Sequence, residues 1–305
     1  MTHIPVMAIE TIKYLAPSQN KPHKKYIDAT LGEGGHAKNI LEAASPTGQL
    51  LGIEWDPQIV QIASKNLKNF DQRVKIVISN YTKLDKVAKD NDFGKVDGIL
   101  LDLGMSSWQL LQGGRGFSFQ KDEPLDMRYN PGSPKDAQYI INRYPENQLA
   151  DIFWRLADER YSRRIAKAIV EARQKEKITR SAQLADLVAT VVSRRGKMFG
   201  FAKDFSRRMG QIHPATRVFQ ALRIEVNQEL ENLQKVLPQA VDILNRGGRL
   251  VVISFHSNED RIVKNFFKGE KRLKILTKKP LRPSWQEIKE NPASRSAKMR
   301  VAEKE

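Results

Sequence analysis

The chain has 305 residues, of which 40% are hydrophobic, so it is long enough for one large or two ordinary globular domains with a buried core. Its 52 Lys and Arg residues exceed its 35 Asp and Glu residues, and the formal net charge of +17 suggests a polyanionic partner. The absence of cysteine excludes disulfides, thiolate metal sites and a thiol nucleophile. No apolar run approaches the ~18 to 20 residues of a membrane span, and no apolar leader segment is evident, so we expect a cytoplasmic protein.

The excess positive charge is concentrated in two segments. Residues 155–210 carry 15 basic and 6 acidic groups, and residues 268–305 carry 12 and 5. A generally solvated basic surface would spread this excess more evenly along the chain. The distribution therefore favours two dedicated anion-binding regions.

The first predicted element is a strand at Lys25–Ile27, followed by the glycine-rich stretch Asp28–His36 and a helix at Ala37–Ala44. Glycines at a strand-to-helix turn are typical of nucleotide binding in α/β folds, because they permit positive φ and a close approach of the ligand. Gly32, Gly34 and Ala37 also satisfy the dinucleotide fingerprint G-x-G-x-x-G/A. A nicotinamide or flavin enzyme is therefore one alternative, and a turn that binds nothing is another.

Two acidic residues of this stretch discriminate between the cofactors. Asp28 and Glu33 would repel a pyrophosphate, whereas the ammonium and sulfonium groups of S-adenosylmethionine would attract a carboxylate. The charge pattern therefore favours the methyl donor.

Further strands are predicted where short segments are almost continuously apolar, as in a buried parallel sheet. They are Gln49–Glu54, Val74–Ser79, Val96–Leu103 and Arg249–His256. The first three alternate with helical patterns at Pro57–Phe70 and Tyr81–Asp90, where Pro57 suits a first helical turn. This alternation predicts an α/β fold with a Rossmann-like sheet.

About 145 residues separate the strand that ends at Leu103 from the one that begins at Arg249, far more than a crossover needs. Helical spacing over Pro145–Val192 predicts that an inserted domain fills this interval. We therefore expect a core of residues 1–108 and 213–305, and an inserted, mainly helical, basic substrate-recognition domain of residues 109–212.

The core is predicted to resume with one long helix over Pro214–Leu244 that ends at Gly247-Gly248, before the fifth strand. Residues Leu273–Thr277 and Lys298–Glu303 are predicted to form a closing antiparallel pair.

Two residues after the second and third strands fit nucleoside binding. Glu54 ends the second strand, twenty-two residues after Gly32, where a carboxylate can accept both hydroxyls of an adenosine ribose. Tyr81 follows the third strand, where an adenine ring can stack, although a core aromatic would occupy the same position.

The loop after the fourth strand reads Asp102-Leu103-Gly104-Met105-Ser106-Ser107-Trp108-Gln109. In an open α/β sheet this loop faces the crevice beside the first glycine loop, so we expect its polar groups to meet the substrate. There, Asp102 together with Ser106 or Ser107 can accept hydrogen bonds from the substrate.

Seven ordered motifs resemble those of the ribosomal RNA small subunit methyltransferase H family, also called MraW or RsmH, from one end of the chain to the other. They are Gly32–His36, Asp102–Gln109, Arg115–Phe119, Pro124–Arg128, His213–Ile224, Ile253–Arg261 and Asn291–Arg300. The sequence departs from the family pattern at Glu54-Trp55 where Asp-Arg is usual, at Tyr81 where Phe is common, and at Ala293 where Arg is usual. Glu54 still provides a carboxylate that can accept hydrogen bonds, and Tyr81 still provides an aromatic ring.

The resemblance implies a class I S-adenosylmethionine-dependent methyltransferase sheet with an inserted helical domain. Its expected activity is methylation of the exocyclic N4 of a P-site cytidine in 16S, or small-subunit, ribosomal RNA, with the 30S particle as partner. The resemblance implies cofactor contacts from Gly34, Gly35, His36, Glu54, Tyr81, Asp102 and Gln109. It leaves the oligomeric state open, with a homodimer as one alternative.

The chemistry of an exocyclic amine is consistent with this activity. The amine is a weak nucleophile because its lone pair is delocalised, so the enzyme must orient it and accept its hydrogens. We expect Asp102, Ser106, Ser107 and His256 to be the catalytic groups. Methylation at cytosine C5 is disfavoured because its usual route needs a cysteine thiolate.

Candidate RNA contacts lie in the motif loops and the basic segments, and the target base must be flipped out to reach the pocket. They are Arg115, Phe117, Arg128, Arg163, Arg164, Arg194, Arg195 and Arg295. For the loop residues Arg115, Phe117 and Arg128, internal packing is an equally good interpretation, and each remaining arginine taken singly fits a solvated charge.

No metal is expected, because the histidines lack ligand spacing and the chain has no cysteine. We instead predict that His256-Ser257-Asn258 caps a helix and that His256 faces the crevice. Two other classes of function remain as alternatives: a dinucleotide oxidoreductase, and an assembly factor that binds RNA without catalysis.

Overall fold

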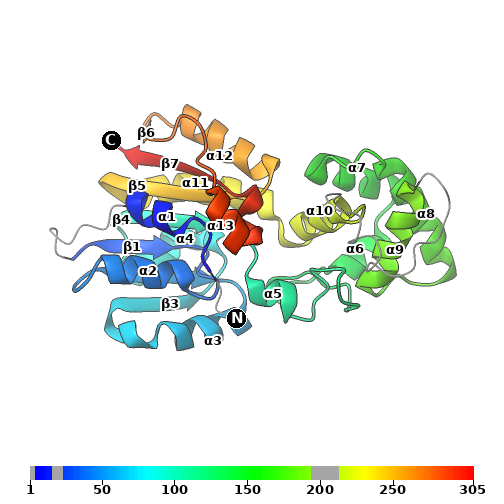
Figure 1. The fold of residues 1–305 in the computed structure, drawn as a ribbon, viewed down its shortest axis with the longest axis horizontal. Helices are drawn as coiled ribbons and strands as arrows, with labels where there is room; N and C mark the ends of the chain where they lie inside the picture. The colour runs from blue at the N-terminus through cyan, green and yellow to red at the C-terminus, as the bar shows by residue number, and fades with distance from the viewer. Residues whose placement is uncertain (1–3, 16–22, 194–212) are drawn as a thin grey trace. The chain divides into compact units, whose positions relative to one another are not determined.

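The computed structural model describes residues 4–15, 23–193 and 213–305. Its contacts divide the chain into two units, one of Met1–Ser106 with Leu230–Glu305 and one of Ser107–Glu229 (Figure 1). Among the described residues, no helix combines the length and the apolar character that crossing a membrane requires.

The first unit contains a sheet whose strand order, within the part of the chain described, is β3-β2-β1-β4-β5-β7-β6. The strands are β1 Lys25–Asp28, β2 Gln49–Glu54, β3 Val74–Ile78, β4 Val96–Asp102, β5 Leu244–Ser254, β6 Leu273–Ile275 and β7 Lys298–Lys304. Strands β1 to β5 are parallel, and β7 is antiparallel to both β5 and β6. The predicted parallel sheet and its closing antiparallel pair are confirmed.

Helices cover both faces of this sheet (Figure 1). They are α1 Ala8–Leu15, α2 Gly35–Ala43, α3 Pro57–Asn66, α4 Leu84–Asp90, α11 Glu229–Ile243, α12 Ser257–Gly269 and α13 Trp285–Glu290, with short 3-10 turns η1 Lys68–Arg73, η2 Tyr81–Lys83 and η3 Pro292–Ser296. Successive strand residues point to opposite faces, so Tyr26 packs with α1 and α2 while Ile27 packs with α4 and α11. Burial on both faces explains why these strands are apolar without alternation.

The second unit is helical among its described residues. Its helices are α5 Ser107–Leu111, α6 Ala137–Arg143, α7 Glu146–Ala157, α8 Ser162–Lys175, α9 Ser181–Val192 and α10 Thr216–Asn227. Helix α7 packs against α8 and α10, and its buried residues Leu149, Ile152 and Leu156 recur at the predicted spacing. The helical interpretation of residues 145–192 is therefore confirmed.

The structure corrects the interpretation of residues 213–248. The predicted single helix is two, α10 and α11, separated by Gln228 in the left-handed conformation with φ 53°. Helix α10 belongs to the second unit, whereas the predicted boundary at residue 212 placed it in the core. Gly247 and Gly248 lie within β5 at an irregularity of its register and do not end the helix, which stops at Ile243.

Candidate cofactor and substrate site

Three carboxylates end neighbouring parallel strands of the first unit. Asp28 ends β1, Glu54 ends β2 and Asp102 ends β4, and β1 lies between the other two strands. The carboxyl ends of parallel strands meet at one edge of a sheet, which is where ligands bind in α/β folds. The edge therefore has the acidic character that the glycine-loop sequence predicted.

The glycine loop between β1 and α2 is shaped by two close approaches. Gly34 has φ 86°, and a Cβ atom there would lie 3.1 Å from the side chain of Leu67. A Cβ atom at Gly35, the first residue of α2, would lie 2.6 Å from Cγ of Pro5. Glycine is therefore required at both positions, and the backbone at the start of α2 carries no side chain that would block a ligand.

Glu54 binds the backbone of this loop. Its Oε2 atom accepts a hydrogen bond from Gly32 N at 3.0 Å, and its Oε1 atom accepts from Trp55 N and Asp56 N at 2.8 and 2.9 Å. Burial raises the pKa of Glu54 to about 7, although the three backbone donors oppose this rise. Glu54 retains acceptor capacity on Oε2, so it can position the loop and also receive a hydroxyl group.

Asp28 is almost completely buried, with 1% of its surface exposed. Its Oδ1 atom accepts from Thr30 N at 3.2 Å, while its Oδ2 atom has no hydrogen-bond partner among the residues that the structure describes. Burial raises the pKa of Asp28 to about 6, even though His36 and the contacts from Thr30 lower it. A buried carboxylate oxygen without a partner is costly, so this atom is a candidate to receive a ligand.

His36 lies between two of the carboxylates. Its Nε2 atom is 3.4 Å from Oδ2 of Asp102, and neither ring nitrogen makes a hydrogen bond of good geometry to any part of the chain described. Burial lowers the pKa of His36, but Asp102, Asp28 and Glu287 together outweigh burial and raise it above the ordinary value. The neighbouring acids therefore favour the protonated form of His36.

Two hydrogen bonds that involve backbone N–H groups also position Asp102. Its N–H donates to Oγ1 of Thr30 at 2.6 Å, and its Oδ1 atom accepts from Gly104 N at 3.3 Å. The carboxylate is therefore held by strand β4, by the loop after it, and by His36 of helix α2. The sequence indicated Asp102 and His36, but it did not indicate the role of Thr30.

Tyr81 begins the 3-10 turn η2, directly after Asn80, whose side chain accepts from Thr82 N. The Tyr81 ring is partly buried against the core cluster beside β4 and α4. It therefore lies after β3, as predicted, and serves partly as a packing residue.

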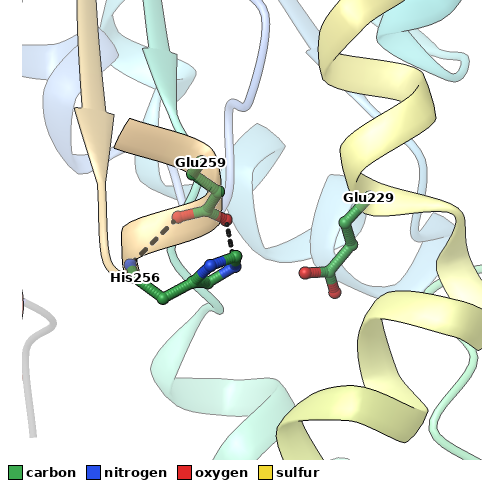
Figure 2. A group of neighbouring side chains, drawn as sticks. All are labelled: Glu229, His256 and Glu259. Atoms are coloured by element: carbon green, nitrogen blue, oxygen red, sulfur yellow. Dashed lines mark hydrogen bonds and ion pairs between the residues drawn. The ribbon is translucent and has the colours of Figure 1, made fainter. Parts of the chain in front are cut away.

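His256 is the N-cap residue of α12, as predicted, whereas β5 ends two residues earlier, at Ser254 (Figure 2). Its Nε2 atom lies 3.1 Å from Oε1 of Glu259, and the side chains are 10% and 3% exposed. The second oxygen of Glu259 accepts from the backbone N–H groups of Phe255 and His256 at 2.8 and 3.3 Å. The sequence interpretation did not identify Glu259 as the residue that fixes this turn, although Glu three residues after an N-cap is a known capping signal.

The remaining residues of the Asp102 loop fall on both sides of the division between units. Ser106 is in the first unit, while Ser107, the first residue of α5, and the buried Gln109 are in the second. The arrangement described for Asp102 thus rests on Thr30, His36 and Gly104 alone.

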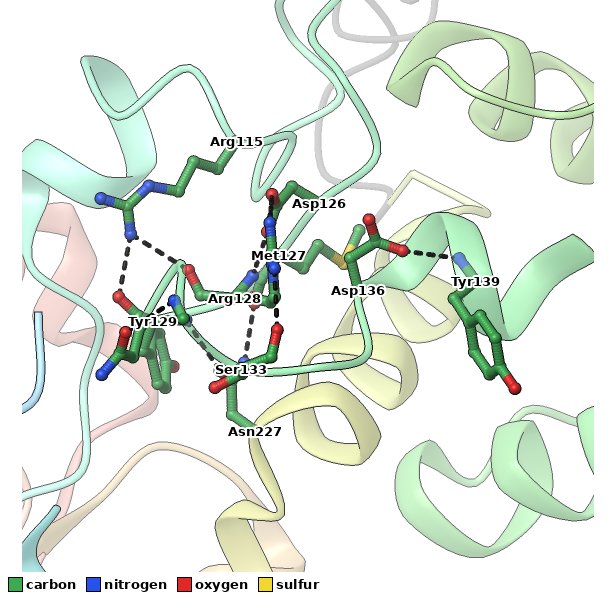
Figure 3. Close-up of polar contacts among 11 residues, drawn as sticks. Arg115, Asp126, Met127, Arg128, Tyr129, Ser133, Asp136, Tyr139 and Asn227 are labelled. Carbon is green, nitrogen blue, oxygen red and sulfur yellow. Dashed lines mark hydrogen bonds and ion pairs between the residues drawn. The ribbon is translucent and has the colours of Figure 1, made fainter.

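The predicted RNA contacts Arg115 and Arg128 bind protein groups within the second unit (Figure 3). Nη1 of Arg115 donates to the carbonyl oxygens of Arg128 and Tyr129 at 3.1 and 2.9 Å. Arg128 donates to both carboxylate oxygens of Asp126, at 2.8 and 2.7 Å, and the Phe117 ring stacks on Tyr129. These contacts favour the packing interpretation for all three residues.

Other predicted RNA contacts lie on the surface. Arg163 and Arg164 are exposed on α8, where Arg164 also lies 5.6 Å from the centre of the Tyr161 ring. Arg295 is exposed in η3 of the first unit. Arg194 and Arg195 lie outside the described residues.

The acidic edge of the first unit fits S-adenosylmethionine. Its buried Asp28 Oδ2 atom lacks a hydrogen-bond partner among the described residues. Carboxylates beside the loop suit an ammonium and a sulfonium, and they would repel a pyrophosphate. Of the residues predicted to contact the cofactor, those that belong to this unit are Gly34, Gly35, His36, Glu54, Tyr81 and Asp102.

Comparison with known proteins identifies the family. The model of the MraW methylase family matches residues 1–305. Ribosomal RNA small subunit methyltransferase H of Syntrophobacter fumaroxidans is 43% identical over 323 residues, which cover 100% of this chain and 97% of the relative. The protein of the same name from Thermotoga neapolitana is 46% identical over 303 residues, which cover 99% of this chain and 95% of the relative. The chain belongs to the MraW methylase family, whose members are class I methyltransferases with S-adenosyl-L-methionine as methyl donor.

Proposed function

We propose that this enzyme methylates the exocyclic N4 of a P-site cytidine in 16S ribosomal RNA, with the 30S particle in the cytoplasm as its substrate. The names of the relatives support small-subunit ribosomal RNA as the substrate class. The formal net charge of +17 supports a polyanionic substrate.

The single observation that carries the proposal is the environment of Asp102. One carboxylate oxygen accepts from the backbone of Gly104 and the other faces His36, 3.4 Å away. This carboxylate is an oriented acceptor at the carboxyl end of β4, the edge at which the glycine loop also lies. An exocyclic amine needs such an acceptor, because its lone pair becomes available only when its hydrogens are bound and oriented.

S-adenosylmethionine supplies a methyl group on a positively charged sulfur, which becomes a neutral thioether when the methyl is transferred. Asp102 would accept a hydrogen bond from N4 and then the proton that N4 loses. His36, whose Nε2 atom lies 3.4 Å from Oδ2 of Asp102, would fix the orientation of this carboxylate. This assignment makes Asp102 a catalytic residue and His36 its positioning partner as well as a cofactor contact.

A reaction at cytosine C5 has no support in this chain. The usual route forms a covalent bond between a cysteine sulfur and C6, and the sequence has no cysteine. Substrate recognition is assigned to the second unit, whose α8 presents the exposed Arg163 and Arg164. Ser106, Ser107, Gln109 and Arg295 keep their predicted roles in this proposal, and the oligomeric state stays open.

The proposal is tested with 30S particles that lack the modification, incubated with the enzyme and methyl-labelled donor. Nucleoside mass spectrometry should find N4-methylcytidine in 16S RNA, and Asp102→Asn should remove it. The exposed Asp90→Asn on α4 serves as the matched control and should leave the label unchanged. Label in another nucleoside, or particle binding without any label, would contradict the proposal.

A further inference from the structure

A cavity of about 280 Å³ opens at the opposite end of the parallel strands from the acidic edge. Its lining includes Lys25 and Gln49, the first residues of β1 and β2, and Arg73 and Lys75 at the start of β3. Asp28 and Glu54 end β1 and β2, so the strands themselves separate the two sites. This cavity is therefore distinct from the candidate cofactor site.

Neutral carbonyl oxygens hold the cations of this cavity. Nζ of Lys25 donates to the carbonyl oxygen of Asp92 at 2.5 Å, and Nζ of Lys75 donates to that of Asn91 at 3.2 Å. Both carbonyls belong to the segment after α4. These contacts orient the ammonium groups without cancelling their charge.

Arg73 is held in the same way. Its Nε and Nη2 atoms donate to the carbonyl oxygens of Gly48 and Leu41, at 2.9 and 2.5 Å. Desolvation lowers the pKa of Arg73, which indicates that its guanidinium is partly removed from water. Its Nη1 group makes no hydrogen bond within the part of the chain that the structure describes and can donate into the cavity.

The charge balance of the lining is strongly positive. Three cations line the cavity, and Asp92 is the one carboxylate among the described lining residues. Its side chain is 89% exposed and lies 3.6 Å from Nζ of Lys75, so solvent screens much of its effect. A structural ion-pair network would have carboxylates and cations in similar number.

Uncharged groups complete the lining. The side-chain amide of Gln49 can donate hydrogen bonds into the cavity. The Phe93 ring is buried, and Nζ of Lys25 lies 5.3 Å from its centre. Fixed cations, an amide donor and an apolar wall are the features by which proteins select a tetrahedral oxyanion with an attached organic group.

We propose that the cavity lined by Lys25, Arg73 and Lys75 binds a phosphate group. Two sources share this chemistry: a phosphodiester of the RNA substrate, and a free phosphate or phosphomonoester. The binding of phosphate itself is independent of the proposed function, and only the assignment of the phosphate to RNA rests on it.

The first experiment measures phosphate binding to the full-length protein in the absence of RNA and methyl donor. Two-dimensional NMR of the labelled protein follows the backbone amides of Lys75 and Asn91 during titration with inorganic phosphate, with chloride replaced to keep the ionic strength constant. We expect saturable shifts in the wild type. Lys25→Gln and Lys75→Gln should each weaken phosphate binding by about tenfold, because each removes a charged donor.

Lys86→Gln is the matched control, since Lys86 is an exposed lysine of α4 outside the lining. Arg73 is left unchanged, because it also holds two backbone carbonyls and its substitution would disturb the fold. Shifts that do not saturate, or an equal loss of affinity in Lys75→Gln and Lys86→Gln, would overturn the proposal.

A second experiment identifies the source of the phosphate. The affinity for 30S particles is measured at several salt concentrations, and a lost RNA phosphate contact reduces the slope of log K against log salt by about one. A reduced slope in Lys75→Gln assigns the site to RNA, and an unchanged slope assigns it to a free phosphate. Failure of the enzyme to produce N4-methylcytidine would leave the phosphate titration unaffected, so the two proposals fail separately.

Discussion

The Nε2 atom of His36 lies 3.4 Å from the Oδ2 atom of Asp102, and the two side chains are only 6% and 16% exposed. His36 belongs to the first turn of α2, and Asp102 is the last residue of β4. Both side chains are largely enclosed by protein, so the contact between them is shielded from water. The pair therefore joins the glycine loop to the strand that carries the proposed catalytic carboxylate.

Asp102→Asn should lower kcat by about 100-fold or more, because an amide cannot accept the proton that the amine loses. Cofactor affinity should fall less, since Glu54 and the glycine loop are unchanged. The measurement compares methyl transfer to 30S particles with calorimetric binding of S-adenosylmethionine. If kcat and affinity fell by the same factor, Asp102 would be a binding residue alone.

The raised pKa values of Glu54 and Asp28 predict a dependence of stability on pH. A carboxyl group whose pKa is higher in the folded chain binds its proton more tightly there, so its contribution is complete below the unfolded pKa and is lost as the pH rises through the folded pKa. Burial places the folded pKa of Glu54 at about 7 and that of Asp28 at about 6. The free energy of unfolding should therefore fall between about pH 4 and pH 7, with on the order of 3 kcal/mol from Glu54.

Urea unfolding of the wild type and of Glu54→Gln at intervals across this range measures the effect. The variant should show a smaller decrease, because glutamine does not titrate. Parallel curves for the two proteins would show that Glu54 is ionised throughout the range.

Much of the first unit was predictable from local pattern. The strands β1 to β4 are short apolar runs, and the carboxyl ends of parallel strands meet at one edge, so the order of residues alone places Asp28, Glu54 and Asp102 together. The break between α10 and α11 could not be predicted, because Gln228 is not a residue that usually adopts positive φ. Gly247-Gly248 was predicted to end a helix because glycine is common at that position. Glycine also permits an irregular strand, which is what these two residues form in β5.

The partners of individual side chains could not be predicted from the sequence. Arg115 and Arg128 are of the residue type that commonly contacts RNA. Only the structure reveals that they bind carbonyl and carboxylate groups of the protein. The burial of Asp28 is likewise a tertiary property, since its neighbours in the chain do not enclose it. Residues that are distant in the sequence set both features, and local propensity carries no information on them.

Gly35→Ala should destabilise the protein by about 1–3 kcal/mol, because the added Cβ would lie 2.6 Å from Cγ of Pro5 and the N-terminal segment would have to move. Cofactor affinity should fall as well, since the same backbone forms the start of α2. Gly94→Ala is the control, because a Cβ there meets nothing within 4 Å. The expectation fails if thermal unfolding and cofactor binding are the same in both variants.

His256→Ala should lower turnover more than cofactor affinity. The imidazole lies against Glu259, which in turn binds the backbone N–H groups of Phe255 and His256, so its removal loosens the turn after β5. His256→Asn keeps a side chain that favours the N-cap and should retain more stability. Steady-state methyl transfer and calorimetry separate the two effects, and equal turnover in His256→Ala and the wild type would remove His256 from the reaction.

Asn227→Ala should destabilise the second unit by about 2–4 kcal/mol. Its Nδ2 atom donates to the carbonyl oxygens of Met127 and Arg223 at 2.8 and 2.9 Å, and its Oδ1 atom accepts from Tyr129 N at 2.8 Å (Figure 3). Met127 is fully buried with φ 60°, a strained conformation that these bonds hold in place. Alanine would remove the partner of the buried Met127 carbonyl oxygen and of the Tyr129 N–H group.

The same substitution should reduce methylation of 30S particles while changing cofactor affinity little, because the segment it holds is assigned to substrate recognition. Asn227→Asp keeps the acceptor for Tyr129 N and loses the donor, so its free energy of unfolding should lie between those of the wild type and Asn227→Ala. Asn147→Ala on α7 is the control, since Asn147 is exposed and its side chain accepts only from the adjacent Gln148 N. Equal unfolding midpoints for Asn227→Ala and Asn147→Ala would show that the turn at Met127 is maintained by other contacts, such as those of Arg115.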